Sequence, residues 1–428
     1  MTNLINPMLD EDEEFDTSNG PVNPLLDDDE EDHQPRPRFS IQRPAATPAE
    51  EPADRKPWEK PVRTAEEEAE LEARKEAGDV PSGKKKRRNS MTAKDMILLA
   101  ALSTFRVMTA EQLSLLLTTS GVHGNTAGQM ASPKTVYNRL LRLKEIGAVQ
   151  DKSIWEEQRI WGATNFGRGA AIASGLVGRP GQVQKKGISG LNYTELPHDL
   201  AVNWVAAQLL SPFGFHRDLI NLPPQLDFTM LRSEYEVQNA WMKMNARLSA
   251  ENKLAKAANP NARERKFKDW RSETITALHA AVAAGETSYR HIADDEPALW
   301  ALGQTPVAGD ELREHHIPDL IINLERFRKG PARGSVAIEV ELNAKSVASY
   351  KKQLILWAAD LQKFKGYPDP ILIKELIYFY VDDAVDEHLR EADAKAGTNL
   401  FASGKLKTVR LTGRDGKTPL NLTTRVSL

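Results

Sequence analysis

The chain has no cysteine among its 428 residues. This absence excludes disulfide bonds, thiolate zinc sites and cysteine nucleophiles, and it fits a reducing cytosol. The sequence also lacks an apolar run of about 18 residues, and its N-terminus leads into an acidic run instead of the basic start of a signal peptide. It therefore predicts a soluble, cytoplasmic protein that does not insert into a membrane.

Two catalytic signatures are absent as well. There is no Gly-x-x-x-x-Gly-Lys-Ser/Thr loop, which argues against a helicase or an ATPase and predicts no bound nucleotide. There is no His-hydrophobe-His metal motif either, so the sequence does not support a relaxase of that type. Without cysteine ligands, zinc is not expected as a cofactor.

The net charge of −3 conceals a strong asymmetry along the chain. Residues 1–54 carry 15 acidic and 3 basic side chains, whereas residues 55–428 carry 54 basic and 45 acidic ones. A basic body suggests an anionic partner such as nucleic acid, and the acidic segment could compete for the same surface. A purely solubilising acidic tail is the alternative.

Residues 1–83 are rich in proline and acidic residues and poor in aromatics. They cannot bury enough apolar area to offset the entropy of ordering, so the sequence predicts a disordered arm. Within it, the segment 5–14 (Ile-Asn-Pro-Met-Leu-Asp-Glu-Asp-Glu-Glu) recurs at 22–31 (Val-Asn-Pro-Leu-Leu-Asp-Asp-Asp-Glu-Glu). Paired weak motifs gain from effective concentration, which favours docking of a protein partner. Low-complexity drift is the other interpretation.

The charge changes sign at Gly83. Residues 83–168 contain 14 Lys or Arg and 6 Asp or Glu, a net +8. Beside a DNA-binding domain, a run of cations would neutralise phosphates, although such runs are also common in solvated linkers. The run that opens this segment consists of Lys84, Lys85, Lys86, Arg87 and Arg88.

Cap signals predict three helices, over residues 92–104, 110–117 and 132–146. The third helix has an apolar face that is expected to enter the core. The other side chains around it have the composition of a DNA-recognition helix. These candidate DNA-binding residues are Lys134, Thr135, Tyr137, Asn138, Arg139 and Arg142.

Two strands, within 148–150 and 159–164, are expected around a charged tip, and a helix follows residues 165–167. Three helices followed by a β-hairpin resemble the winged helix family, a type of helix-turn-helix DNA-binding domain. The resemblance implies that the third helix lies in the major groove and that the wing and nearby backbone hold phosphates. A winged helix used only for protein contacts is the alternative.

A composition break predicts a linker over 179–192, between the domain 84–178 and a larger α/β domain over 193–428. The fold class is thus α+β and multidomain. The larger domain is expected to begin with a helix over 195–210 that carries His198, then a strand over 213–220 and a helical insertion over about 236–305. It is completed by strands over 316–323 and 336–341, a helix over 348–364 and a strand over 376–381.

Asp319 and Glu339 lie in two of these strands. Paired strands would bring the carboxylates together, and hard oxygen ligands of this kind suit Mg²⁺ or Mn²⁺. The spacing of Pro318-Asp319 and Glu339-Val340-Glu341 resembles the PD-(D/E)xK nuclease superfamily. In that superfamily the Asp and the first acidic residue bind metal, and a Lys two positions later assists. Glu341 stands at the position of that lysine here, so a displaced amine would have to come from Lys345, Lys351 or Lys352.

Five short motifs follow the predicted winged helix along the chain. They are His198-Asp199-Leu200, Arg232-Ser233-Glu234, Pro318-Asp319, Ile338-Glu339-Val340-Glu341 and Tyr350-Lys351-Lys352. Together with the winged helix, this layout resembles the plasmid replication-relaxation family, found on plasmids and other mobile elements of Gram-positive bacteria. The resemblance implies a role in replication, mobilisation or their regulation.

Three functions remain open from the sequence. The first is a DNA-binding factor whose second domain is a catalytically silent nuclease-like fold, and the second is a metal-dependent DNA endonuclease that uses a displaced lysine. The third is a protein-interaction scaffold or transcriptional regulator. The helix-turn-helix signal is clearer than the catalytic signal, which favours the first.

Overall fold

The computed structural model describes residues 91–118, 129–154, 158–178, 181–185, 187–211, 213–214, 226–285, 296–303, 315–323, 335–361 and 372–420. The predicted arm with its repeats and the run Lys84–Arg88 lie outside these residues. Residues 91–428 form one unit with an α+β architecture. Among the described residues, no helix combines the length and the apolar composition that a membrane crossing requires.

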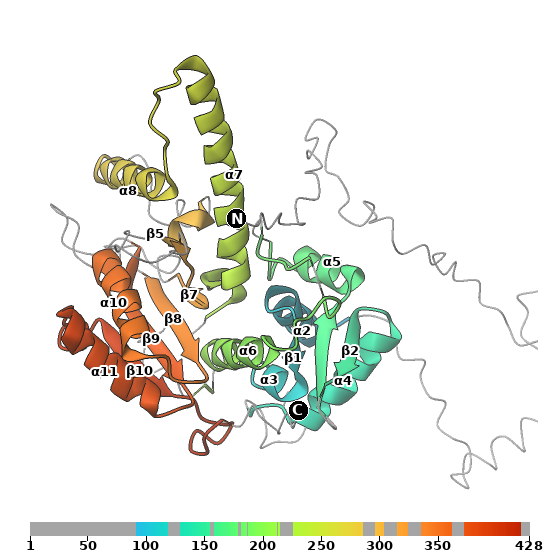
Figure 1. Cartoon of the computed structure of the whole chain (residues 1–428). Coiled ribbons are helices and arrows are strands. Elements are labelled where there is room, and N and C mark those ends of the chain that lie inside the picture. The colour runs from blue at the N-terminus through green and yellow to red at the C-terminus, as the bar shows by residue number, and fades with distance from the viewer. Residues whose placement is uncertain are drawn as a thin grey trace, which may run out of the picture. The chain divides into compact units, whose positions relative to one another are not determined.

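The N-terminal part of this unit starts with three helices, as the cap signals predicted (Figure 1). In each helix, a Ser or Thr side chain accepts a hydrogen bond from the backbone N–H three residues later, which satisfies a donor that the helix leaves free. Gly147, with φ of +77°, follows the last turn of the third helix in the left-handed region. The helices are α2 (Ala93–Thr104), α3 (Ala110–Ser114) and α4 (Pro133–Glu145).

A small antiparallel sheet with strand order β1-β3-β2 packs with these helices. The predicted hairpin is confirmed as β2 (Val149–Ser153) and β3 (Arg159–Ala163), and α5 (Asn165–Ala173) follows it. Strand β1 (Met108–Thr109) was not predicted, since two residues are too short for a periodic pattern. The second helix is shorter than the predicted range 110–117, because α3 ends at Ser114. The chain then turns toward an isolated bridge between Thr118 and Met130.

A five-stranded mixed sheet forms the other part of the unit, with strand order β10-β9-β8-β7-β4. The pairs β4–β7 and β7–β8 are antiparallel, whereas β8–β9 and β9–β10 are parallel. Helices α10 (Val347–Leu361) and α11 (Ala384–Ala396) connect the parallel strands and pack against each other (Figure 1). The strands are β4 (Leu231–Ser233), β7 (Leu320–Ile322), β8 (Ser335–Glu341), β9 (Ile373–Tyr380) and β10 (Leu406–Arg410).

The strand predicted over 316–323 is not continuous. It is divided into β6 (His315–His316), which pairs with β5 (Leu302–Gly303), and β7. The break covers Ile317, Pro318 and Asp319, and Pro318 has no N–H to donate to a ladder. Of the strand predicted over 213–220, residues 215–220 lie outside the described part of the chain, and residues 213–214 are not in a strand.

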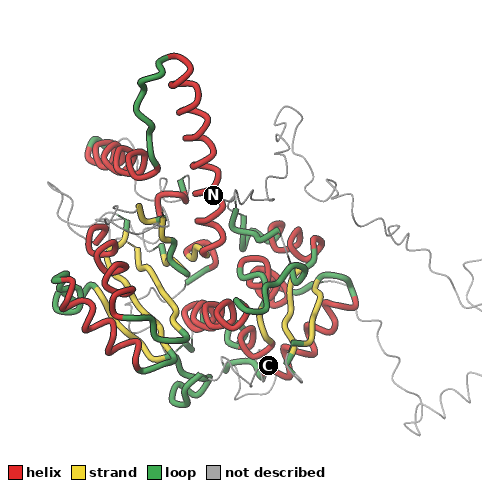
Figure 2. The backbone as a smooth tube through the Cα atoms, in the orientation of Figure 1, coloured by secondary structure: helices red, strands yellow, loops and turns green. Residues whose placement is uncertain are grey.

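Helix α6 (Leu196–Leu210) lies between the two sheets, contacting both β1 and β8 (Figure 2). Its Asn203 side chain donates hydrogen bonds to the carbonyls of Phe105 and Val107, and Trp204 Nε1 donates to the Thr412 carbonyl. Part of the predicted linker packs against the rest of the unit, since Gln182 is fully buried and donates to the Phe228 carbonyl. A single apolar cluster therefore extends from α2 through α6 to β8. The predicted domain boundaries remain predictions.

The predicted helical insertion contains α7 (Glu234–Ala258) and α8 (Phe267–Ala283). Helix α7 starts directly after β4 and leads away from the five-stranded sheet, and the chain then returns through α8 (Figure 1).

Candidate functional site

Asp319 and Glu339 meet where β7 and β8 pair. Asp319 directly precedes β7, and the antiparallel register pairs Leu320 with Ile338, so Asp319 falls opposite Glu339 one step further along. Both residues are almost fully buried, with 9% and 5% of their surface exposed. Asp319 Oδ2 accepts a hydrogen bond from the Val340 backbone N–H at 2.7 Å. The structure thus brings together the two carboxylates that the sequence singled out.

A histidine contacts each of these carboxylates. His316 Nε2 lies 2.6 Å from Glu339 Oε1. His198, in the first turn of α6, places its Nε2 3.5 Å from Asp319 Oδ2 and 3.1 Å from the Val340 carbonyl oxygen. Sequence reasoning noted His198 only within a motif and gave His316 no role.

These contacts change the ionisation of the site. Burial would lower the pKa of His198, but its hydrogen bond to Asp319 and the charge of that carboxylate outweigh burial and raise the pKa to about 9. Burial would also lower the pKa of His316, yet the charge and hydrogen bond of Glu339 raise it. Burial raises the pKa of Glu339, which His316 offsets only in part. His198 is therefore cationic at neutral pH, beside Asp319.

Glu341, two positions after Glu339, pairs with a lysine from the loop that follows β8. Its Oε1 contacts Lys345 Nζ, and burial raises the pKa of Glu341 while Lys345 partly offsets this. The Tyr350 hydroxyl accepts a hydrogen bond from the Lys345 backbone N–H at 3.2 Å, which holds this loop against α10. Of the predicted lysines, Lys345 contacts a candidate carboxylate, and Lys352 lies at an exposed position of α10.

Two further acidic residues influence this cluster. Glu234, the first residue of α7, donates its backbone N–H to the Asp319 carbonyl at 3.2 Å. The pKa of Glu234 is raised to about 7, mainly by loss of hydration and to a smaller extent by the charge of Asp319. Glu234 is nevertheless an exposed residue. Burial raises the pKa of Asp199, and the charge of His198 partly offsets this. The sequence signal for both was their place in motifs to which no chemistry had been assigned.

Asp319 and Glu339 are engaged by neighbouring groups of the protein in the arrangement that they adopt. Asp319 Oδ2 accepts a hydrogen bond from the Val340 backbone N–H, and Glu339 Oε1 is hydrogen-bonded to His316 Nε2. In the described part of the chain, no group of three or more His, Asp or Glu residues is placed to hold a metal ion. His198 lies beside Asp319, and Lys345 pairs with Glu341. Binding of Mg²⁺ or Mn²⁺ by Asp319 and Glu339 stays a prediction.

Helix α4, the predicted DNA-recognition helix, buries its apolar face in the core. Val136, Leu140 and Leu143 are fully buried, as the periodicity predicted. The candidate DNA-binding residues divide into two groups around the rest of the helix. Those with exposed side chains are Lys134, Thr135 and Asn138.

The remaining candidates on α4 are engaged within the protein. Tyr137 is half-buried and packs edge-on against Trp161, with ring centroids 5.7 Å apart. Arg139 Nη1 lies 2.8 Å from Asp95 Oδ1, and Arg142 Nη2 contacts Asp95 Oδ2. Burial would raise the pKa of Asp95, but hydrogen bonds from Arg139 and from the Thr92 cap outweigh burial and lower it. Three of the six candidates on this helix therefore help to hold the fold.

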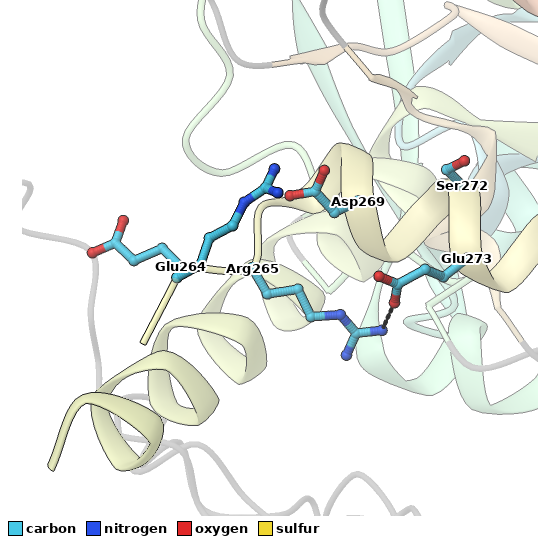
Figure 3. A pocket seen from close by; sticks show the side chains of 6 residues that line it. Glu264, Arg265, Asp269, Ser272 and Glu273 are labelled. Carbon is cyan, nitrogen blue, oxygen red and sulfur yellow. Dashed lines mark hydrogen bonds and ion pairs between the residues drawn. The ribbon is translucent and has the colours of Figure 1, made fainter. Parts of the chain in front are cut away.

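A separate pocket of about 370 Å³ lies at the start of α8 (Figure 3). It includes none of the predicted site residues, and its Arg265 is turned toward Glu273 and pairs with it. The residues that line it are Arg263, Glu264, Arg265, Asp269, Ser272 and Glu273.

Two places in the chain thus carry candidate function: the exposed face of α4 and the buried carboxylate cluster of β7 and β8. The chain was compared with protein-family models, curated proteins and solved structures, and none of them matches it.

Proposed function

We propose that the chain binds duplex DNA through the exposed face of α4. The observation that carries this proposal is that Lys134, Thr135 and Asn138 are exposed on a helix whose opposite face is fixed in the core. Side chains of these types donate hydrogen bonds to phosphates and to base edges. The element order also resembles the winged helix family, in which the third helix enters the major groove.

The charge of this part of the chain supports the same proposal. Residues 83–168 carry a net +8, while the chain as a whole carries −3. A local surplus of this sign attracts a polyanion and contributes an affinity that falls as the salt concentration rises.

The second part of the proposal is that the five-stranded sheet belongs to a degenerate nuclease-like domain. Apart from α7, α8, β5 and β6, which lie between β4 and β7, the elements run α6, β4, β7, β8, α10 and β9. This is the helix, strand, strand, strand, helix, strand order expected from the sequence, with β4 in place of the strand predicted over 213–220. The acidic cluster is charge-compensated by histidines and Lys345, which supports a structural role. By resemblance, the protein would act in replication or mobilisation of a plasmid or other mobile element, or in regulating these processes.

The test is binding of the full chain to mixed-sequence duplex DNA at several salt concentrations. Lys134→Ala/Asn138→Ala is the informative variant, because it removes two exposed groups and leaves the Asp95 ion pairs intact. We expect weaker binding and an unchanged melting temperature. Lys395→Ala, which removes one exposed lysine on α11, is the charge-matched control. Equal affinity of all three proteins, or no salt-dependent binding by the wild type, would refute the proposal.

A metal-dependent endonuclease is the second candidate. It is favoured by the pairing of Asp319 opposite Glu339 and by Lys345 beside Glu341, which offers an amine near the position where the superfamily has its lysine. Plasmid nicking with Mn²⁺ separates this candidate from the first.

A further inference from the structure

The connection between α7 and α8 is the feature that the proposed function leaves unexplained. Residues 243–268 contain eight basic and two acidic side chains, a net +6 over 26 residues. This charge density exceeds that of residues 83–168, yet the segment belongs to the predicted helical insertion of the second domain. We refer to residues 243–268 as the basic arm.

The basic arm is exposed over most of its length. Beyond Leu248, the last buried residue of α7, every residue to Asn261 is exposed except Asn252, which is half-buried. Asn252 holds the returning chain, since its side chain donates to the Arg265 carbonyl and accepts from the Arg265 backbone N–H, both at 2.9 Å. Alanine is frequent in this stretch, and its high helix propensity sustains the helix without packing. The arm is a defined projection from the sheet (Figure 1).

Internal ion pairs account for only part of the charge. Glu251 is shared by Arg247 and Arg265, and Glu264 pairs with Lys256. The other cations of the arm are exposed and form no salt bridge with any residue that the structure describes. They are Lys243, Lys253, Arg263, Lys266 and Lys268.

We propose that the basic arm binds phosphates of duplex DNA outside the segment that α4 contacts, an inference that rests on the proposed function. Lys243 and Lys256 are separated by 13 positions of α7, about 20 Å of helix, and duplex DNA offers a phosphate for about every 1.7 Å of its axis. Clustered like charges repel one another, and a polyanion relieves this cost. The arm has one large exposed apolar side chain beyond Leu248, Leu254, which is too little for an apolar docking surface.

The arm would therefore contribute affinity and footprint length without reading sequence, because phosphate contacts carry no direct base information. The test uses the full chain and two mixed-sequence duplexes of about 15 and about 40 base pairs. Lys253→Gln/Lys266→Gln/Lys268→Gln removes three unpaired cations of the arm. Lys185→Gln/Lys374→Gln/Lys395→Gln removes the same number of positive charges from other described parts of the protein and serves as the charge-matched control. Circular dichroism verifies that both variants keep the wild-type helix content.

On the long duplex, the arm variant should lower the slope of log K against log salt by about 0.9 for each phosphate that the protein no longer neutralises, or about 2.7 for three. Its protected footprint should shorten, and its affinity at low salt should fall more than tenfold. The control should match the wild type within about twofold. An arm variant with the wild-type slope and footprint would overturn the inference while leaving α4 binding in place. Absence of DNA binding by the wild type would instead refute the proposed function itself.

Discussion

Asp95 Oδ1 lies 2.8 Å from Arg139 Nη1, and this ion pair joins the first turn of α2 to the middle of α4. The second carboxylate oxygen contacts Arg142, so one fully buried acid holds two arginines that are each about one-quarter exposed. From the sequence, both arginines were predicted to contact DNA. Their position makes them poor probes of DNA binding, because their loss would also disturb the orientation of α4.

The first prediction is that Asp95→Ala destabilises the fold and thereby weakens DNA binding. The substitution removes the hydrogen bonds that the Asp95 carboxylate accepts from the Thr92 N–H and hydroxyl, and it deprives two arginines of their carboxylate partner. The loss should cost about 2–3 kcal/mol of unfolding free energy. Urea unfolding measures this loss. Arg142→Ala should cost less in the Asp95→Ala background than in the wild type, since the pair is already broken. Additive losses would show that the two residues act independently.

A second prediction concerns Arg232 in β4 and Glu236 in α7, which form an ion pair at 2.7 Å with at most 1% of either side chain exposed. Arg232→Met alone should cost about 3 kcal/mol or more, because the buried Glu236 carboxylate would lose the Arg232 guanidinium that lies 2.7 Å away. The double variant Arg232→Met/Glu236→Leu should be more stable than Arg232→Met. Denaturant unfolding of the three proteins tests this, and a double variant less stable than Arg232→Met would contradict it.

The same pair explains why β4 could not be predicted from the sequence. Arg232-Ser233-Glu234 has the composition of an exposed charged stretch, and its burial depends on a partner and a sheet that only the fold supplies. Helix starts were predictable because a cap and its helix lie within a few residues, as at Thr92 and Ser132. The strand predicted over 316–323 is divided in the structure. Predicting this division would have required giving Pro318 more weight than the apolar residues that follow it.

The candidate site was predictable only in its carboxylates. Asp319 and Glu339 could be paired from neighbouring strands, whereas no signal in the sequence indicated that His316 and His198 would contact them. His316 is 23 positions from Glu339, and His198 is 142 positions from Val340, whose carbonyl it contacts. The contact of His198 depends on how α6 packs between the sheets, and no local pattern encodes that packing.

A third prediction follows from the raised pKa of His198, about 9 against an ordinary value of 6.5. The stability that protonated His198 contributes is fully present below about pH 6.5 and is lost as the pH rises through about 9. Glu234 has a pKa of about 7 against an ordinary value of 4.5, so its ionisation also lowers the stability of the fold as the pH rises from about 4.5 to about 7. Urea unfolding should show that the wild type is less stable at about pH 9 than at about pH 6. His198→Gln should reduce this difference, and an unchanged difference would contradict the assignment.

The last prediction is that the native protein nicks DNA weakly or not at all. Glu341 adds a third carboxylate where the nuclease superfamily has a lysine, and Lys345, the nearest replacement, is engaged by Glu341 itself. Among the residues that the structure describes, the cations that contact this cluster, His198 and Lys345, are already paired with carboxylates and do not balance phosphate charge. We expect background nicking of a plasmid with Mn²⁺ by the wild type and by Asp319→Ala. Glu341→Lys supplies the missing lysine, so nicking that appears in this variant and disappears on adding Asp319→Ala would identify a nuclease site that lacks only this residue. Strong wild-type nicking that Asp319→Ala abolishes would reverse our ranking of DNA binding above cleavage, because it would make the protein an endonuclease with a displaced lysine. Nicking that survives Asp319→Ala would come from a contaminant.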